Sequence, residues 1–263
     1  MPPFEHAVAA TRGARDYQED TAAFWPDGGE AVRLSSDGPS YDQGGFAVLA
    51  DGMGGHAGGA VASRMVCENF LKSAADHSGS VTDRLMAALR AANGAIAAKI
   101  EESPLLAGMG STLVGTAFGA SGVEWVSVGD SPLFLVRRGE IFLLNEDHSL
   151  APEIDKLAAA GKMSWEDAQS DPRRHFLRSA LTGSDIEMID RSRVPLVLEA
   201  GDVVIMASDG IQTLGHAEIL GIVEAHAAQG PDAVADALLA AVDAAGDLYQ
   251  DNTTVVVVAV KRD

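Results

Sequence analysis

Four aspartates stand at the ends of apolar runs, a placement typical of metal-ligand carboxylates. Asp51, Asp130 and Asp209 follow such runs and precede Gly or Ser, while Asp251 comes shortly before the run 253–260. A buried strand that ends on an acid and then turns delivers that acid to the rim of a sheet. Each segment alone would be an ordinary turn signal. Four together predict one shared acidic site.

The N-terminal part of the chain adds an arginine and two adjacent acids to this set, Arg15, Glu19 and Asp20. Carboxylates gathered without a counter-charge repel one another, so the cluster predicts a bound cation. The chain has no Cys/His spacing suited to zinc and no calcium-loop pattern. Carboxylates and backbone carbonyls suit Mg²⁺ or Mn²⁺.

Two such ions sharing Asp51 would hold a water and lower its pKa, which makes hydroxide available for in-line attack on phosphorus. The guanidinium of Arg15 could hold two phosphoryl oxygens. Signatures of covalent catalysis are missing, because Cys67 has no Arg six positions later and there is neither a Gly-x-Ser-x-Gly elbow nor a Walker loop.

Composition narrows the classes of partner. The net charge of −19 over 263 residues argues against nucleic acid or an anionic membrane as a general partner. Residues 1–6 resemble no signal peptide, and no run of about 18 apolar residues occurs. Cys67 is the single cysteine, which fits a reducing compartment. We therefore expect a cytoplasmic protein.

Hydrophobic periodicity predicts one domain spanning residues 1–263, an α/β sandwich of two mainly antiparallel sheets flanked by helix pairs (α-β-β-α). Residues 147–180, here called the flap segment, are polar and interrupt the strands, which predicts a functional excursion. A surface loop is expected at 27–45. Helices are expected at 58–72, 81–100, 152–160, 216–228 and 232–245, and strands at 4–10, 186–191, 194–198, 202–207 and 253–260. The runs 110–118, 123–128, 133–136 and 141–144 predict an antiparallel meander.

The order of these motifs resembles the bacterial branch of the metal-dependent protein phosphatases, the protein phosphatase 2C (PPM) family, over nearly the whole chain. The motifs that carry the resemblance are Arg15 with Glu19-Asp20, Asp51-Gly52-Met53-Gly54-Gly55-His56, Gly108-Met109-Gly110-Ser111-Thr112, Gly129-Asp130-Ser131, Leu181-Thr182-Gly183, Ser208-Asp209-Gly210 and Asp251-Asn252-Thr253.

The resemblance implies a serine/threonine phosphatase that holds two Mn²⁺ or Mg²⁺ ions tightly. Asp51 would bridge both ions, the carbonyl of Gly52 would bind one, and Asp209 and Asp251 would complete the other. Asp20 would contact a metal through water.

Three further properties follow from the same resemblance. Asp130 would help to hold a weaker third ion, and Arg15 would bind the substrate phosphate. The flap segment resembles the mobile flap of the family. Phosphorylated proteins, the products of a cognate Ser/Thr kinase, would be the substrates of a monomeric enzyme.

Two positions depart from the family pattern. Some relatives have a histidine as general acid where this chain has Met53, and His56 and Glu19 are only lesser candidates for a site role. Many relatives have an arginine where this chain has Pro132. The general acid is therefore unassigned.

Two other functions remain open from the sequence: a metal-dependent phosphoesterase acting on small molecules, and an inactive phosphoprotein-binding scaffold. Arg173, Arg174 and Arg178 could dock phosphoproteins, although a solvated helix face is the simpler interpretation.

Overall fold

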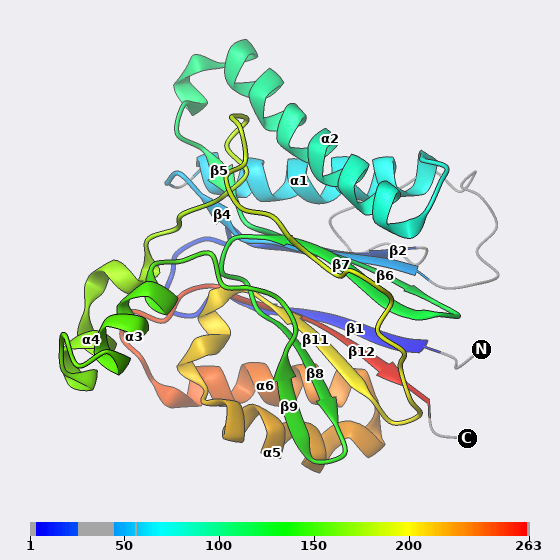
Figure 1. The fold of residues 1–263 in the computed structure, drawn as a ribbon, viewed down its shortest axis with the longest axis vertical. Coiled ribbons are helices and arrows are strands. Elements are labelled where there is room, and N and C mark those ends of the chain that lie inside the picture. Colours follow the sequence, from blue (N-terminus) through cyan, green and yellow to red (C-terminus); the bar gives the residue numbers. More distant parts are fainter. Residues whose placement is uncertain (1–3, 26–44, 56, 262–263) are drawn as a thin grey trace.

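The computed structural model describes residues 4–25, 45–55 and 57–261. Two five-stranded antiparallel sheets pack face to face, and a pair of helices covers each outer face (Figure 1). This is the α-β-β-α sandwich that the sequence predicts. Its main elements are β1 (Phe4–Thr11), β2 (Thr21–Trp25), β3 (Gly45–Ala50), β4 (Gly52–Met53), α1 (Ala57–Asp76), α2 (Val81–Glu102), β5 (Gly110–Ser111), β6 (Leu113–Gly119), β7 (Gly122–Val128), β8 (Leu133–Arg137), β9 (Glu140–Leu143), α3 (Ala151–Ala159), α4 (Trp165–Ser170), β10 (Asp190–Arg191), β11 (Val203–Ala207), α5 (His216–His226), α6 (Pro231–Ala245) and β12 (Thr253–Val260).

The two sheets have the strand orders β1-β12-β11-β8-β9 and β10-β7-β6-β3-β2, and β4 pairs with β5 in a short separate ribbon. β1 is an edge strand, as its weak alternation predicts, and it pairs antiparallel with β12 along its whole length. Short 3₁₀ turns lie at Pro104–Leu106 (η1), Pro172–His175 (η2), Asp209–Thr213 (η3) and Ala227–Gln229 (η4).

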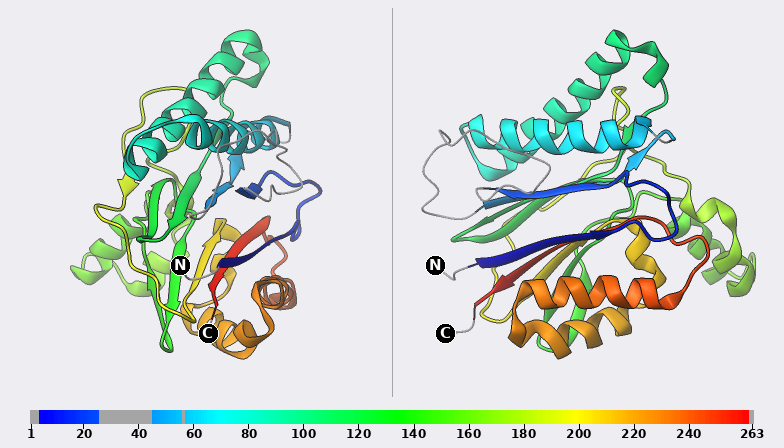
Figure 2. Two further views of the ribbon diagram at one scale, coloured as in Figure 1. Left: turned by 90° about the vertical axis from the view of Figure 1, so that its right-hand side faces the viewer. Right: turned by 180° about the vertical axis from the view of Figure 1, so that it is seen from behind.

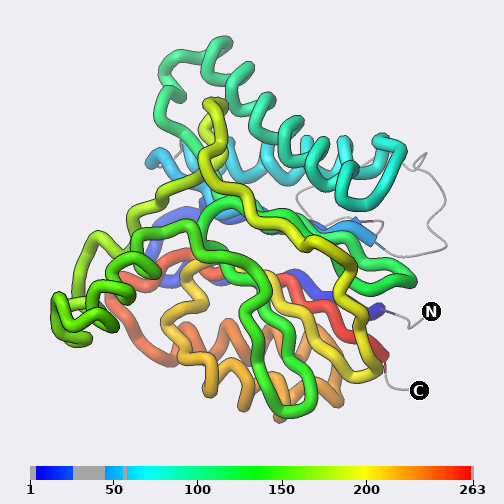
Figure 3. The backbone as a smooth tube through the Cα atoms, in the orientation of Figure 1, coloured from blue at the N-terminus to red at the C-terminus, as the bar shows by residue number. Residues whose placement is uncertain are grey.

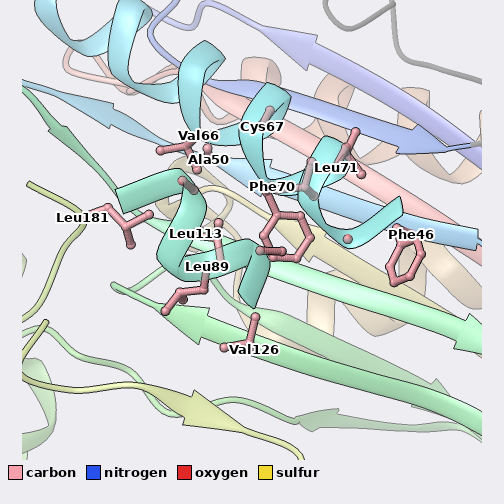
Figure 4. Packing of buried hydrophobic residues seen from close by; sticks show 14 of the residues in the cluster. Phe46, Ala50, Val66, Cys67, Phe70, Leu71, Leu89, Leu113, Val126 and Leu181 are labelled. Atoms are coloured by element: carbon pink, nitrogen blue, oxygen red, sulfur yellow. The ribbon is translucent and has the colours of Figure 1, made fainter. Parts of the chain in front are cut away.

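Central strands are buried on both faces, and the alternation of their side chains creates three apolar layers. In β3, Phe46, Val48 and Ala50 pack toward α1 and α2 (Figure 4), whereas Ala47 and Leu49 pack between the sheets. β12 divides its valines between the two sheet faces in the same manner. A period of two places successive side chains on opposite faces, so one uninterrupted apolar run serves two layers.

The helices pair as predicted, with α1 against α2 over one sheet and α5 against α6 over the other (Figure 2). Ser80 begins α2 by accepting a hydrogen bond from the backbone N–H of Asp83 at 3.1 Å. This bond satisfies one of the donors that the first turn of a helix leaves unpaired.

A glycine allows α1 to approach its sheet closely. The ring of Phe70 lies over β6 so tightly that a Cβ at Gly115 would stand 2.1 Å from the Cζ atom of the ring. Phe70 is fully buried among Leu71, Leu89 and Leu113 (Figure 4). This contact fixes the distance between the helical layer and the sheet.

The predicted meander of residues 110–144 is wrong as a single sheet. β6 and β7 belong to one sheet, whereas β8 and β9 belong to the other, so the chain changes sheet between Val128 and Leu133. Gly129 has φ 106° and turns the chain out of its strand. Apolar runs buried on both faces look alike in either sheet, and therefore the sequence pattern did not reveal this crossing.

The strands predicted at 186–191 and 194–198 are also largely wrong. The first is reduced to β10, and the second is an isolated bridge between Leu196 and Val123. Pro195 lacks the N–H that a continuous ladder needs, and Val194 and Val197 face solvent. The surface loop predicted at 27–45 lies outside the described residues, except for Gly45, which begins β3.

The flap segment contains the predicted helix, α3, and also α4 and η2, which were not predicted. It lies at one end of the sandwich, beside the loop after β1 and the loop before β12 (Figure 3). The described ends of the chain lie at the opposite end (Figure 1). No helix of the described part is long and apolar enough to cross a membrane.

Truncation of Phe70 tests this packing. Phe70→Ala should lower the free energy of unfolding by about 3–5 kcal/mol, because the side chain is fully buried and the cavity cannot collapse against a rigid sheet. Urea denaturation measures the change. The control is Leu105→Ala, at a side chain that is 100% exposed, which should change stability by less than about 0.5 kcal/mol. Equal effects of the two variants would contradict this account.

Candidate active site

The four strand-end aspartates meet at one cavity. Asp51, Asp130, Asp209 and Asp251 line a hollow of about 720 Å³ at the flap end of the sandwich. Arg15, Glu19, Gly52 and Met53 line it as well. Residues separated by more than two hundred positions in the chain, such as Arg15 and Asp251, therefore line one cavity.

Hydrogen bonds to the main chain hold Asp51 at the end of β3. Its N–H donates to the Thr112 hydroxyl at 2.9 Å, and its carbonyl accepts from the N–H of Thr112 at 2.8 Å. The same hydroxyl contacts the Ser131 hydroxyl at 2.8 Å. Thr112 thus connects Asp51 with the loop that carries Asp130, across the point where the chain changes sheet.

Gly52 stands where no side chain fits. A Cβ at this position would lie 2.1 Å from the carbonyl oxygen of Gly59 and 2.6 Å from that of Glu19. The absence of a side chain allows α1 and the Arg15 loop to close around the residue that follows Asp51. This packing is independent of any ligand role of its carbonyl.

Asp20 lies behind the cavity and is 8% exposed. Its carboxylate accepts a hydrogen bond from the Ser208 hydroxyl at 2.7 Å, and Ser208 in turn accepts from the N–H of Thr254 at 2.9 Å. Burial raises the pKa of Asp20 to about 6, although the hydrogen bond from Ser208 opposes the rise. Asp20 therefore joins the end of β11 to the start of β12.

Burial and neighbouring negative charges raise the pKa values of Asp51, Asp130 and Asp209. Burial first, then the charges of Asp20 and Asp209, raise the pKa of Asp51 well above its ordinary value. Burial first, then Asp251, raise the pKa of Asp209. Burial raises the pKa of Asp130 to about 8. The ionised forms of these acids therefore need a compensating positive charge.

The available donor atoms suit a hard divalent cation. The Oδ1 atom of Asp209 is buried and accepts no hydrogen bond from the described part of the chain. No group of three or more His, Cys, Asp or Glu side chains among residues 4–25, 45–55 and 57–261 is already arranged around one point as a metal cage. Water and backbone oxygens complete such coordination shells for Mg²⁺ and Mn²⁺. The residues present fit these ions.

Both carboxylate oxygens of Asp251 already have partners. Arg15 Nη2 donates to Asp251 Oδ2 at 2.6 Å, and the other carboxylate oxygen accepts the N–H of Asn252 at 2.8 Å. The sequence analysis assigned Arg15 to the substrate and Asp251 to a metal. The structure adds direct contact between the two side chains.

Asn252 holds the loop that carries Arg15. Its Oδ1 atom accepts the N–H of Glu19 at 2.8 Å, and its Nδ2 group donates to the carbonyls of Arg12 and Tyr17 at 3.0 Å each. Asn252 belongs to a motif that the sequence analysis used, but its positioning role was not predicted. One amide side chain fixes both ends of the loop because it both donates and accepts.

The flap segment contributes residues that the sequence analysis did not select. His175, Phe176 and Leu177 line the cavity beside the aspartates. The fully buried His148 accepts the N–H of Gly129 through Nδ1 at 3.2 Å, and burial lowers the pKa of its imidazole. No sequence motif marks these two histidines. His56, the lesser candidate for general acid, lies outside the described residues.

Comparison with known proteins identifies the family to which this chain is similar. The family model described as "Protein phosphatase 2C" matches residues 35–229. Serine/threonine protein phosphatase PstP of Mycobacterium tuberculosis is 36% identical over 181 residues, which are 68% of this chain and 34% of that protein. Serine/threonine phosphatase stp of Listeria innocua is 32% identical over 172 residues, 64% of this chain and 66% of that one. The chain spans about a third of the length of PstP.

Solved structures agree over nearly the whole chain. The crystal structure of the M. tuberculosis phosphatase PstP/Ppp superposes with a TM-score of 0.77 and 31% identity, and the alignment covers 98% of this chain and 99% of that one. The catalytic domain of PstP in complex with 2 manganese ions gives a TM-score of 0.75 and 30% identity, with coverage of 98% and 99%. Family model, sequence relatives and fold therefore coincide: the chain belongs to the protein phosphatase 2C (PPM) family.

Proposed function

We propose that this chain is a metal-dependent serine/threonine protein phosphatase. The observation that carries the proposal is the convergence of Asp51, Asp130, Asp209 and Asp251 on one cavity beside Arg15. Similarity to PstP and stp, both named as serine/threonine phosphatases, supports the reaction class. The catalytic-domain structure of PstP, in complex with manganese ions, supports Mn²⁺ as cofactor.

For the ions we propose the ligands that the resemblance implies. Asp51 would be shared by two of them, with the carbonyl of Gly52 on one and Asp209 and Asp251 on the other. Asp20, buried behind Asp51, would act through an intervening water. When bound, Mn²⁺ or Mg²⁺ would supply positive charge and lower the pKa of a water molecule.

Asp130 is proposed to hold a third, weaker ion. It lines the same cavity as Asp51, Asp209 and Asp251, and its raised pKa marks a carboxylate without a compensating cation. Thr112 and Ser131 fix its loop relative to Asp51.

Arg15 would orient the phosphoryl group. The guanidinium has five N–H donors, and the contact with Asp251 uses one of its terminal nitrogens. Donors that remain can hold two phosphoryl oxygens, which aligns the phosphorus with the ions. Asp251 would thus anchor the arginine that binds substrate.

We further propose that residues 1–263 form one phosphatase domain in which residues 147–180 are the flap. The substrates would be phosphoproteins made by a cognate Ser/Thr kinase, and the protein would be a cytoplasmic monomer. Turnover of a phosphothreonine peptide with Mn²⁺, compared with nucleotides and sugar phosphates, tests this function. Preference for the small molecules would favour a small-molecule phosphoesterase, and no turnover would favour a binding scaffold.

Replacement of Asp51 tests the metal site. Titration calorimetry with Mn²⁺ should show at least two sites in the wild type and a large loss of affinity for both in Asp51→Asn, because one carboxylate serves both ions. Asp130→Ala is the matched comparison and should keep the two tight sites while losing turnover. If Asp51→Asn binds both ions as tightly as the wild type does, Asp51 is not shared by two metal ions.

Metal-free stability should depend on pH through these acids. The folded pKa of Asp130 is about 8 and that of Asp20 about 6, against an ordinary value of 3.8. A carboxyl group whose pKa is higher in the folded protein than in the unfolded chain stabilises the folded state fully below pH 4. This contribution is lost as the pH rises through 6 for Asp20 and through 8 for Asp130. Each unit of pKa corresponds to about 1.4 kcal/mol.

In a chelating buffer, calorimetric melting from pH 4 to 8 should therefore show a progressive loss of a few kcal/mol in the wild type relative to Asp130→Asn. Addition of Mn²⁺ at pH 8 should restore more stability to the wild type than to the variant. Parallel pH profiles of the two proteins would contradict this assignment of charge.

Arg15→Ala should weaken turnover without weakening metal binding. We expect kcat/KM for a phosphopeptide to fall by about 2–4 kcal/mol in transition-state terms, the scale for losing a charged contact to substrate. Mn²⁺ affinity should be retained, because the change releases Asp251. Arg90→Ala, at an exposed arginine of α2, is the control. An unchanged kcat/KM in Arg15→Ala would contradict a role of Arg15 in binding the substrate phosphate.

A further inference from the structure

A second cavity, of about 630 Å³, adjoins the cavity of the aspartates. Asp130 lines both, so the two hollows meet at that carboxylate. Four parts of the chain build the second cavity: the β7–β8 loop that carries Asp130, the β8–β9 hairpin, the flap segment, and the turn from η3 into α5. None of its other lining residues belongs to the set proposed above for the metals or the phosphate.

One wall of this cavity is apolar. Its large side chains are Phe134, Leu143, Leu214 and Ile219. Phe134 is buried and meets the ring of His216 edge to face, with ring centroids 5.2 Å apart. Leu143 is 47% exposed, whereas Phe134, Leu214 and Ile219 are buried, so Leu143 presents most of the accessible apolar surface of this wall.

The same lining carries negative charge. Asp147 lines the cavity near Asp130, and its charge is one of the causes, after burial, that raise the pKa of Asp130. Asp147 Oδ1 accepts the N–H of Ser149 at 2.7 Å, which fixes the side chain at the entry to the flap segment. Two neighbouring carboxylates thus face a hollow with an apolar wall.

The arginine in this lining is paired mainly with another acid, and its charge also interacts with that of Asp147. Arg174 donates to both carboxylate oxygens of Asp155, the closer at 2.5 Å, and to the carbonyl of Ala168. It is therefore engaged with a third acid of the same cavity.

The other two arginines of the flap segment are also paired within it. Arg173 pairs with Asp171, and Arg178 pairs with Glu153. The sequence analysis considered these arginines as a docking surface for phosphoproteins. Their internal partners argue against that role. In the lining of the second cavity, the three acids Asp130, Asp147 and Asp155 outnumber the single arginine, Arg174.

We propose that the second cavity binds a lysine or arginine side chain of the substrate, close in sequence to the phosphorylated residue. This inference rests on the proposed phosphoprotein phosphatase activity. The aliphatic stem would lie along Phe134, Leu143 and Leu214, and the cationic head would reach Asp147. Long basic side chains bury their stems on apolar surface and keep their charge at its polar edge. The net charge of −19 also favours encounter with basic substrates.

The position of the basic residue can be bounded. An extended peptide advances about 3.3 Å per residue, so a side chain in a cavity that adjoins the phosphate site belongs within roughly three residues of the phosphothreonine. A set of phosphothreonine peptides tests this position. Each peptide carries one lysine, placed between three residues before and three residues after the phosphothreonine, and the peptide with the highest kcat/KM identifies the preferred position.

The test pairs this lysine peptide with one in which norleucine replaces lysine, because norleucine keeps the stem and removes the charge. In the wild type we expect kcat/KM to be about tenfold higher for lysine, on the scale of one charged contact at an interface. Asp147→Asn should abolish most of this preference, and the amide oxygen can still accept the Ser149 N–H. Both peptides are compared at one Mn²⁺ concentration, so any effect of the variant on metal binding cancels in the ratio.

Two further variants sharpen the result. Glu166→Gln, at an exposed acid of α4 outside this cavity, should keep the lysine preference. Leu143→Ser should lower kcat/KM for the lysine and norleucine peptides alike, because both use the apolar wall. Together these outcomes separate the charge of Asp147 from the general acidity of the surface.

If the protein hydrolyses aryl phosphate, and hydrolyses all peptides with the same kcat/KM whatever the position of the lysine, this inference is wrong and the proposed function still stands. A lysine preference that survives in Asp147→Asn would overturn it as well. Failure to hydrolyse both aryl phosphate and phosphopeptides with Mn²⁺ would overturn the proposed function and this inference with it.

Discussion

Repulsion among buried carboxylates is the constraint on which the site depends. These acids oppose one another, because the charges of Asp20 and Asp209 raise the pKa of Asp51 and the charge of Asp251 raises the pKa of Asp209. The fold holds them in place through main-chain hydrogen bonds at Thr112 and through Ser208, which joins Asp20 to the start of β12. Folding therefore supplies the energy that holds the acids together, and a divalent cation recovers part of it on binding.

Much of this arrangement could be predicted from the sequence, because the strand-end acids carry a local signal. An apolar run followed by Asp-Gly, as at Asp51 and Asp209, marks both the strand and the position of its acid. The membership of β8 in the other sheet had no such signal, since its residues are buried on both faces. His175 and the second cavity also depend on how the flap segment folds back, which no local pattern encodes. Prediction succeeded where one segment determines the outcome and failed where two segments must meet.

The flap segment shows why counting charges along a chain misleads. Arg173, Arg174 and Arg178 form a basic run in the sequence, yet each is paired with an acid inside the same segment. The charge presented to a substrate is therefore that of the acids left over, Asp147 among them. Such pairs lie mostly at the surface, where salt screens them, so they define a local shape more than they stabilise the fold.

The contact between Phe70 and Gly115 has a consequence for how such a chain can evolve. The ring occupies the place where a Cβ at position 115 would stand, so neither residue can be enlarged alone. An alanine at 115 would be tolerated only after the aromatic ring at 70 had become smaller or had turned aside. The two positions are therefore expected to change together among descendants of this sequence, and an ancestor that carried one change without the other would have been a poorly folded intermediate.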